Sequence, residues 1–160
     1  MKIVLLLLIS FPVLGQKIFL KNTAPQNITS EMSVFSEPNS RKTLEEVIRQ
    51  KFTPFRKDIF MAIASNETLW LKISLTNEVA TQKDWVLECG DKGIEHYIFF
   101  ELDTSGKSTV TRSGMAAQTK FPVSALFYGI NPHCLFSLAP RQTKTFYIKI
   151  AGDQSRAFRL

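Results

Sequence analysis

The feature that most constrains the fold is the alternation of apolar and polar residues in the segment LWLKISLT, residues 69–76. Every second residue is a leucine or isoleucine, and the residues between them are Trp70, Lys72, Ser74 and Thr76. A period of two places these two sets on opposite faces of a β-strand. The segment therefore predicts a strand with one face in a core and the other at least partly solvated.

Similar strand signals recur along the chain. Strands are predicted at residues 84–89, 94–102, 108–112 and 145–150, and Phe158 and Leu160 begin another at the chain end. Turn residues separate them, and the crossover helices that a parallel sheet requires are missing from the pattern. The expected fold is all-β, an antiparallel sandwich or jelly roll.

One short helix is predicted at residues 43–50. Thr43 caps its start, Glu46 is the reciprocal partner of a capping box, and Leu44, Val47 and Ile48 form an apolar stripe. Pro54 prevents the helix from continuing. We interpret this helix as an insertion between strands.

The N-terminus predicts export. Lys2 precedes an apolar run that is too short to span a bilayer, and Val13 and Gly15 occupy the −3 and −1 positions of a cleavage site before Gln16. We expect a signal peptide at residues 1–15, a flexible arm at 16–30 and a β-sandwich domain at 31–160, its last strand truncated. The mature domain would lie on the periplasmic side of a bacterial inner membrane.

Charge and cysteine content narrow the function classes. The net charge is +6, and the basic residues are scattered, which argues against a nucleic-acid partner. Cys89 and Cys134 are either bridged in the oxidising compartment or are two buried side chains that never meet. His96 and His133 lack the spacing of zinc ligands, so no metal or cofactor is expected.

Candidate ligand-binding residues follow from residue type. Trp70 either stacks on a sugar ring or packs in the interior. The long loop at residues 115–132 carries Phe121, Phe127 and Tyr128, which form either a binding platform at one rim or an extra packed strand.

Polar residues complete the candidate set. Lys72 and Arg112 could contact an anionic ligand, and His133 could sense pH, although ordinary surface or half-buried roles remain the alternative for each. The set contains five residues: Trp70, Lys72, Arg112, Tyr128 and His133. Motifs of nucleophilic, metal-dependent or nucleotide-dependent enzymes are missing, so catalysis is not expected.

Several segments together resemble a known family. They are SVFSEPNS, TLEEV followed by Phe52-Thr53-Pro54, WLKISLTN, WVLE, Gly114 in the mid-chain loop, and LAPRQTKTFYIKI. In this order and approximate spacing they resemble the second type of extracellular domain of seven-transmembrane receptors with diverse intracellular signalling modules, over residues 32–160. Lys72 stands where that family usually has an arginine.

The resemblance implies a jelly roll similar to galactose-binding domains. It also implies a downstream seven-helix membrane region and a cytoplasmic output domain, so we expect the chain to be a fragment of a receptor. Two functions are predicted from this. The first is an extracytoplasmic sensor for a small molecule, such as a saccharide; the second is an interaction module that forms a homodimer and binds no small ligand.

Overall fold

The computed structural model describes residues 17–39, 41–55, 61–63, 67–90, 94–103, 106–114, 117, 131–151 and 156–158. The predicted signal peptide lies outside these residues. So does most of the 115–132 loop, with Phe121, Phe127 and Tyr128.

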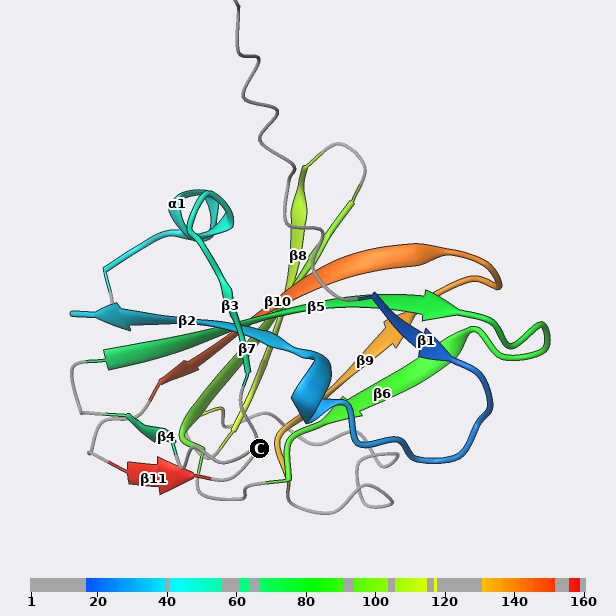
Figure 1. The fold of residues 1–160 in the computed structure, drawn as a ribbon, viewed down its shortest axis with the longest axis horizontal. Helices are drawn as coiled ribbons and strands as arrows, with labels where there is room; N and C mark the ends of the chain where they lie inside the picture. The colour runs from blue at the N-terminus through cyan, green and yellow to red at the C-terminus, as the bar shows by residue number, and fades with distance from the viewer. Residues whose placement is uncertain are drawn as a thin grey trace, which may run out of the picture.

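A large sheet of seven strands organises the domain (Figure 1). Its strand order is β3-β2-β5-β10-β7-β8, and β1 lies alongside β5. Neighbours are antiparallel except for β1 and β5, which are parallel. The strands are β1 Lys17–Leu20, β2 Ser33–Pro38, β3 Thr53–Pro54, β5 Glu67–Asn77, β7 His96–Leu102, β8 Ser108–Ser113 and β10 Thr143–Ala151.

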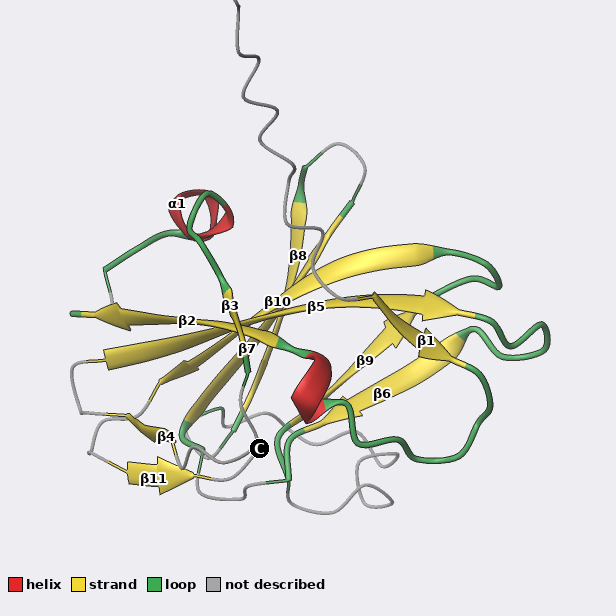
Figure 2. Cartoon of the chain, in the orientation of Figure 1, coloured by secondary structure: helices red, strands yellow, loops and turns green. Residues whose placement is uncertain are grey.

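Among the described residues, the other elements are two strand pairs and two short helical segments. Strand β6 (Asp84–Glu88) pairs with β9 (His133–Ser137), and β4 (Met61–Ile63) pairs with β11 (Arg156–Phe158). The helical pieces are α1 (Leu44–Ile48) and the 3-10 turn η1 (Thr29–Glu31), and strands dominate everything else (Figure 2). The predicted all-β sandwich is confirmed, and β11 confirms the strand expected at the chain end.

The hydrophobic core lies between the large sheet and the β6–β9 pair. Leu69, Leu71, Ile73 and Leu75 of β5 are each only 1% exposed, as their alternation predicts. From the neighbouring strands, Phe99 and Phe146 stack with ring centroids 5.0 Å apart, and Phe136 of β9 meets Phe146 at 4.9 Å. We call this side of the large sheet the inner face.

The predicted helix is confirmed, together with its capping box. The Glu46 amide donates to the Thr43 hydroxyl at 3.4 Å, and the Thr43 amide donates to the Glu46 carboxylate at 2.8 Å. These bonds satisfy amide groups that the first helical turn leaves without partners. Leu44 and Val47 are buried, so α1 is anchored on the side of the large sheet opposite β6 and β9 (Figure 1).

The structure corrects the predicted flexible arm at residues 16–30. Lys17–Leu20 form strand β1, paired in register with Ser74–Asn77 of β5. Ile18 and Leu20 are buried, while Lys17 and Phe19 face outward. The short apolar alternation KIFL was too brief to be distinguished from a linker, yet β5 offers it a free edge beyond the end of β2.

The two cysteines follow the second of the predicted alternatives: both are buried thiols, not a disulfide. Cys134 lies opposite Leu87 on the β6–β9 ladder, and the Cys89 amide donates to the Pro132 carbonyl at 2.8 Å. The two cysteines are therefore diagonal neighbours on adjacent strands. Their Cα atoms are roughly 7–8 Å apart in such an arrangement, farther than the Cα atoms of a typical disulfide. Geometry thus explains why adjacent strands leave them unbridged.

Candidate functional site

We call the side of the large sheet opposite the core the outer face. It carries the residues that alternate along each strand with those of the inner face. Strand register aligns them in rows. One row runs Phe35, Trp70, Lys149, Ile98 and Arg112 across β2, β5, β10, β7 and β8. The next row runs Ser33, Lys72, Tyr147, Phe100 and Val110 across the same strands. Paired residues of an antiparallel ladder share a face, so aromatic and basic side chains are interleaved here.

Trp70 is only 1% exposed, so the predicted interpretation as an exposed stacking platform is wrong and the packing alternative is correct. Its indole is stacked on Phe100 with centroids 5.6 Å apart and packs with Leu44 and Val47 of α1. Its Nε1–H donates to the Glu37 carboxylate at 2.8 Å. Helix α1 therefore covers Trp70, whose indole packs between the helix and the outer face of the sheet.

Glu37 is a buried acid on the outer face, and sequence reasoning missed it. Its carboxylate also accepts a hydrogen bond from the Lys42 amide, and its exposure is 1%. Both carboxylate oxygens are thus engaged by N–H donors, which compensates the cost of burying a charge. The acidic residue in SVFSEPNS gave no local sign that it would meet a tryptophan 33 positions away.

Two lysines are held over aromatic rings. The Lys149 ammonium lies 5.3 Å from the centroid of Trp70. The Lys72 ammonium lies 5.9 Å from Phe52 and 6.0 Å from Tyr147. Both lysines are half-buried. A cation over a ring face is attracted by the ring quadrupole, so these contacts orient the ammonium groups without cancelling their charge.

Arg112 is exposed on β8, in the same row as Lys149. The structure therefore brings Lys72 and Arg112, two of the candidate residues, to one face and adds Lys149, which the sequence analysis did not select. The alternation in TKTFYIKI assigns Tyr147 and Lys149 to one face of their strand. Only the pairing of β10 with β5 places that face beside Trp70 and Lys72.

His133 does not join this face. It begins β9, opposite Glu88, and its backbone amide donates to the Ser113 hydroxyl at 3.2 Å. Its Nδ1 is 2.9 Å from the Asn131 carbonyl. His133 is thus on the β6–β9 pair, on the other side of the large sheet from Lys72. Tyr128 lies outside the described residues.

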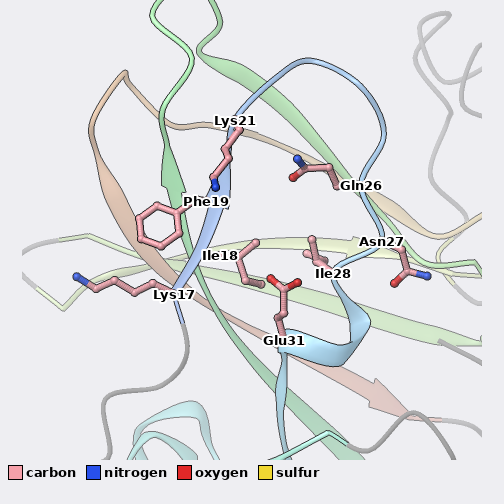
Figure 3. Close-up of a pocket in the computed structure, with 8 residues that line it drawn as sticks. All are labelled: Lys17, Ile18, Phe19, Lys21, Gln26, Asn27, Ile28 and Glu31. Atoms are coloured by element: carbon pink, nitrogen blue, oxygen red, sulfur yellow. The ribbon is translucent and has the colours of Figure 1, made fainter.

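A separate region, near the N-terminal end of the described chain, contains a hollow. An open hollow of about 470 Å³ lies between β1 and the segment leading into η1 (Figure 3). It is lined by Lys17, Ile18, Phe19, Lys21, Gln26, Asn27, Ile28 and Glu31. Its charged residues have both signs, and Ile18 and Ile28 belong to the core or pack against it. It therefore lacks the consistent positive charge of the outer face.

Two further findings concern membranes and metals. In the described ranges, no helix has the length and apolar character needed to cross a bilayer. No group of three metal-binding side chains occurs among the residues that the structure describes.

The family comparison agrees with the fold and with the resemblance. The sequence model described as 7TMR-DISM extracellular 2 matches residues 29–160, most of the chain. The chain therefore belongs to this family of extracellular domains of seven-transmembrane receptors, and its place is outside the cytoplasm. A search of the curated proteins finds no match.

Proposed function

We propose that this domain is the ligand-sensing part of its receptor and binds a small molecule, of the saccharide class, on the outer face of the large sheet, without turning it over. Membership in an extracellular receptor-domain family supports a sensing role. The observation that carries the site assignment is the combination of half-buried apolar side chains, such as Ile98 and Phe100, with the basic side chains of Lys72, Lys149 and Arg112. Ligand sites typically combine apolar surface with a few polar groups that fix the orientation of the ligand.

Binding at this face would affect signalling only under one thermodynamic condition. A ligand shifts a receptor between two arrangements only as far as it prefers one of them. The outer face extends from β3 and β2 at one edge of the large sheet, where α1 also lies, to the β7–β8 hairpin at the other edge (Figure 1). A ligand that contacts both sides would favour one disposition of these elements.

The test is a glycan array probed with the purified chain and two matched variants. Phe100→Ala alters the outer face, whereas Leu135→Ala removes a side chain that is 54% exposed on β9. We expect glycan binding that Phe100→Ala abolishes and Leu135→Ala preserves, with both variants checked for folding by circular dichroism. Absence of glycan binding together with concentration-dependent dimerisation would contradict the proposal and favour the interaction module.

A further inference from the structure

Three basic residues in the described part of the outer face, Lys72, Lys149 and Arg112, lie in adjacent rows of the sheet. Lys149 is diagonal to Lys72 on the β5–β10 ladder, which corresponds to roughly 7–8 Å between their Cα atoms. Arg112 lies two strands from Lys149 in the same row, a step of about 10 Å at the usual strand spacing. Three cations from three strands thus lie on the same face of the sheet.

These cations have no acidic partner in the described part of the chain. No salt bridge involving Lys72, Lys149 or Arg112 occurs there. Lys144 provides the contrast on the same strand: its ammonium forms an ion pair with Glu101 and donates to the Ser137 carbonyl at 2.9 Å. The Lys144 ammonium on the inner side of β10 is therefore paired with an acid, whereas the Lys149 ammonium on the outer side has no ion pair with any residue that the structure describes.

Glu37, the buried acid among the described residues of this face, does not change the balance. Glu37 is 1% exposed, and its two oxygens already accept N–H groups from Trp70 and Lys42. Among the described residues, the basic side chains of Lys72, Lys149 and Arg112 therefore stand against a carboxylate whose oxygens are already occupied. A surface of this kind gains electrostatically from a negatively charged ligand.

Aromatic contacts order the charges in advance. The rings of Trp70, Phe52 and Tyr147 hold two of the ammonium groups at 5.3–6.0 Å. Because long lysine side chains lose considerable rotamer freedom on binding, charges that are already positioned cost less to use.

The apolar part of the face distinguishes a glycan from a membrane. A membrane-binding surface would present several large exposed apolar side chains. Among the described residues on the strands of this patch, Val110, at 37%, is the one large exposed apolar side chain, whereas Ile98 and Phe100 are half-buried. Half-buried apolar side chains between separated cations suit a ring bearing carboxylate or sulfate groups.

We propose that the ligand of the outer face is an acidic saccharide whose anionic groups contact Lys72, Lys149 and Arg112. This inference rests on the proposed function and specifies its ligand class. Since the three cations are spread over several strands, an oligosaccharide with more than one anionic group should bind more tightly than a single acidic sugar.

The experiment compares trigalacturonate with its fully methyl-esterified form, which has the same rings but no charge. Calorimetry should show binding of the acid that is about tenfold tighter than that of the ester and that weakens between about 50 and 500 mM NaCl. Lys149→Gln should weaken trigalacturonate binding about fivefold. The matched control is Lys107→Gln, the same charge change at the exposed β7–β8 turn, which should leave the affinity unchanged.

The possible results separate this inference from the proposed function. Equal affinity for acid and ester, both lost in Phe100→Ala, would overturn the acidic ligand and leave glycan sensing intact. Failure of trigalacturonate and of a sulfated heparin tetrasaccharide to bind, with neutral glycans retained on the array, would do the same. Binding to vesicles with about 30% phosphatidylglycerol, without binding to either acidic oligosaccharide, would overturn it in favour of a membrane surface.

Discussion

Along β10, successive residues belong to two different environments. Phe146 and Ile148 face the core at no more than 1% exposure, among apolar side chains, two thiols and Tyr97. Tyr147 and Lys149, their direct neighbours, face α1 and the basic group of the outer face. One strand therefore builds a dry interior on one side and a charged, ring-lined surface on the other.

The difference shows where this domain derives its stability and where it can recognise a ligand. Removing apolar area from water contributes about 25 cal/mol per Å², and the inner face is where that area is most completely removed. Cation–π contacts at partly exposed sites contribute only about 0.5–1 kcal/mol each. The outer face thus holds its cations in place at little cost or gain in stability.

The largest expected effect is on the inner face. Phe146→Ala removes a fully buried ring that touches both Phe99 and Phe136, so it should lower the free energy of unfolding by about 3–5 kcal/mol. Urea unfolding measures this. Val110→Ala, a truncation on the outer face at a side chain 37% exposed, is the control and should cost less than about 1 kcal/mol. Similar losses in the two variants would refute the assignment of stability to the inner face.

The inner face should also be sensitive to alkali. Burial raises the pKa of Tyr97 and of Cys134 above the ordinary values, so the folded chain keeps these protons at pH values where the unfolded chain loses them. The contribution of these two groups to the free energy of unfolding is fully present below the pKa values that they have in the unfolded chain. It falls as the pH rises above those values, by about 1.4 kcal/mol per pH unit for each group.

Urea midpoints between about pH 8 and pH 11 test this dependence. Tyr97→Phe keeps the ring and removes the ionisable hydroxyl, so its stability should decline less steeply than that of the wild type. Parallel declines in the two proteins would show that Tyr97 does not cause the alkaline loss.

On the outer face, the Trp70–Glu37 hydrogen bond joins a buried indole to a buried carboxylate. Trp70→Phe removes the indole N–H that donates to the Glu37 carboxylate at 2.8 Å and leaves that buried oxygen without its donor. The substitution should therefore lower the free energy of unfolding by about 1–3 kcal/mol. Trp85→Phe is a matched control, because the buried Nε1 of Trp85 has no hydrogen-bond partner within the part of the chain that the structure describes. The two substitutions would have equal effects if the hydrogen bond contributed nothing.

Much of this fold could be predicted from the sequence, because local patterns carry the information. The alternation in LWLKISLT predicted the greater part of β5 and its inner face, although the strand begins two residues earlier at Glu67, and Thr43 with Glu46 predicted the start of α1. The β7–β8 turn followed from the residues between the two strands. Strand β1 was missed because four residues carry too little pattern, and its place depends on a free edge of β5.

The site was harder to predict, because it depends on register between distant strands. Lys72 and Arg112 were selected by residue type, but nothing local indicates that β10 and β7 lie between them. Lys149 becomes part of the group only through its pairing with Trp70. The partial burial of the face depends on α1, a helix whose sequence reveals its ends but not the surface that it covers.

The smallest expected effect on stability comes from a comparison of the two lysines of β10, Lys144 and Lys149. Lys149→Met keeps an unbranched side chain over Trp70 and should change the free energy of unfolding by no more than about 0.5 kcal/mol, since the ammonium has no ion pair there among the described residues. Lys144→Met removes the partner of Glu101 and should cost more. In calorimetry with trigalacturonate the order should reverse, with Lys149→Met losing affinity and Lys144→Met retaining it. If Lys144→Met weakened binding as much as Lys149→Met, the ligand would be responding to overall charge, and the two faces would not differ in recognition.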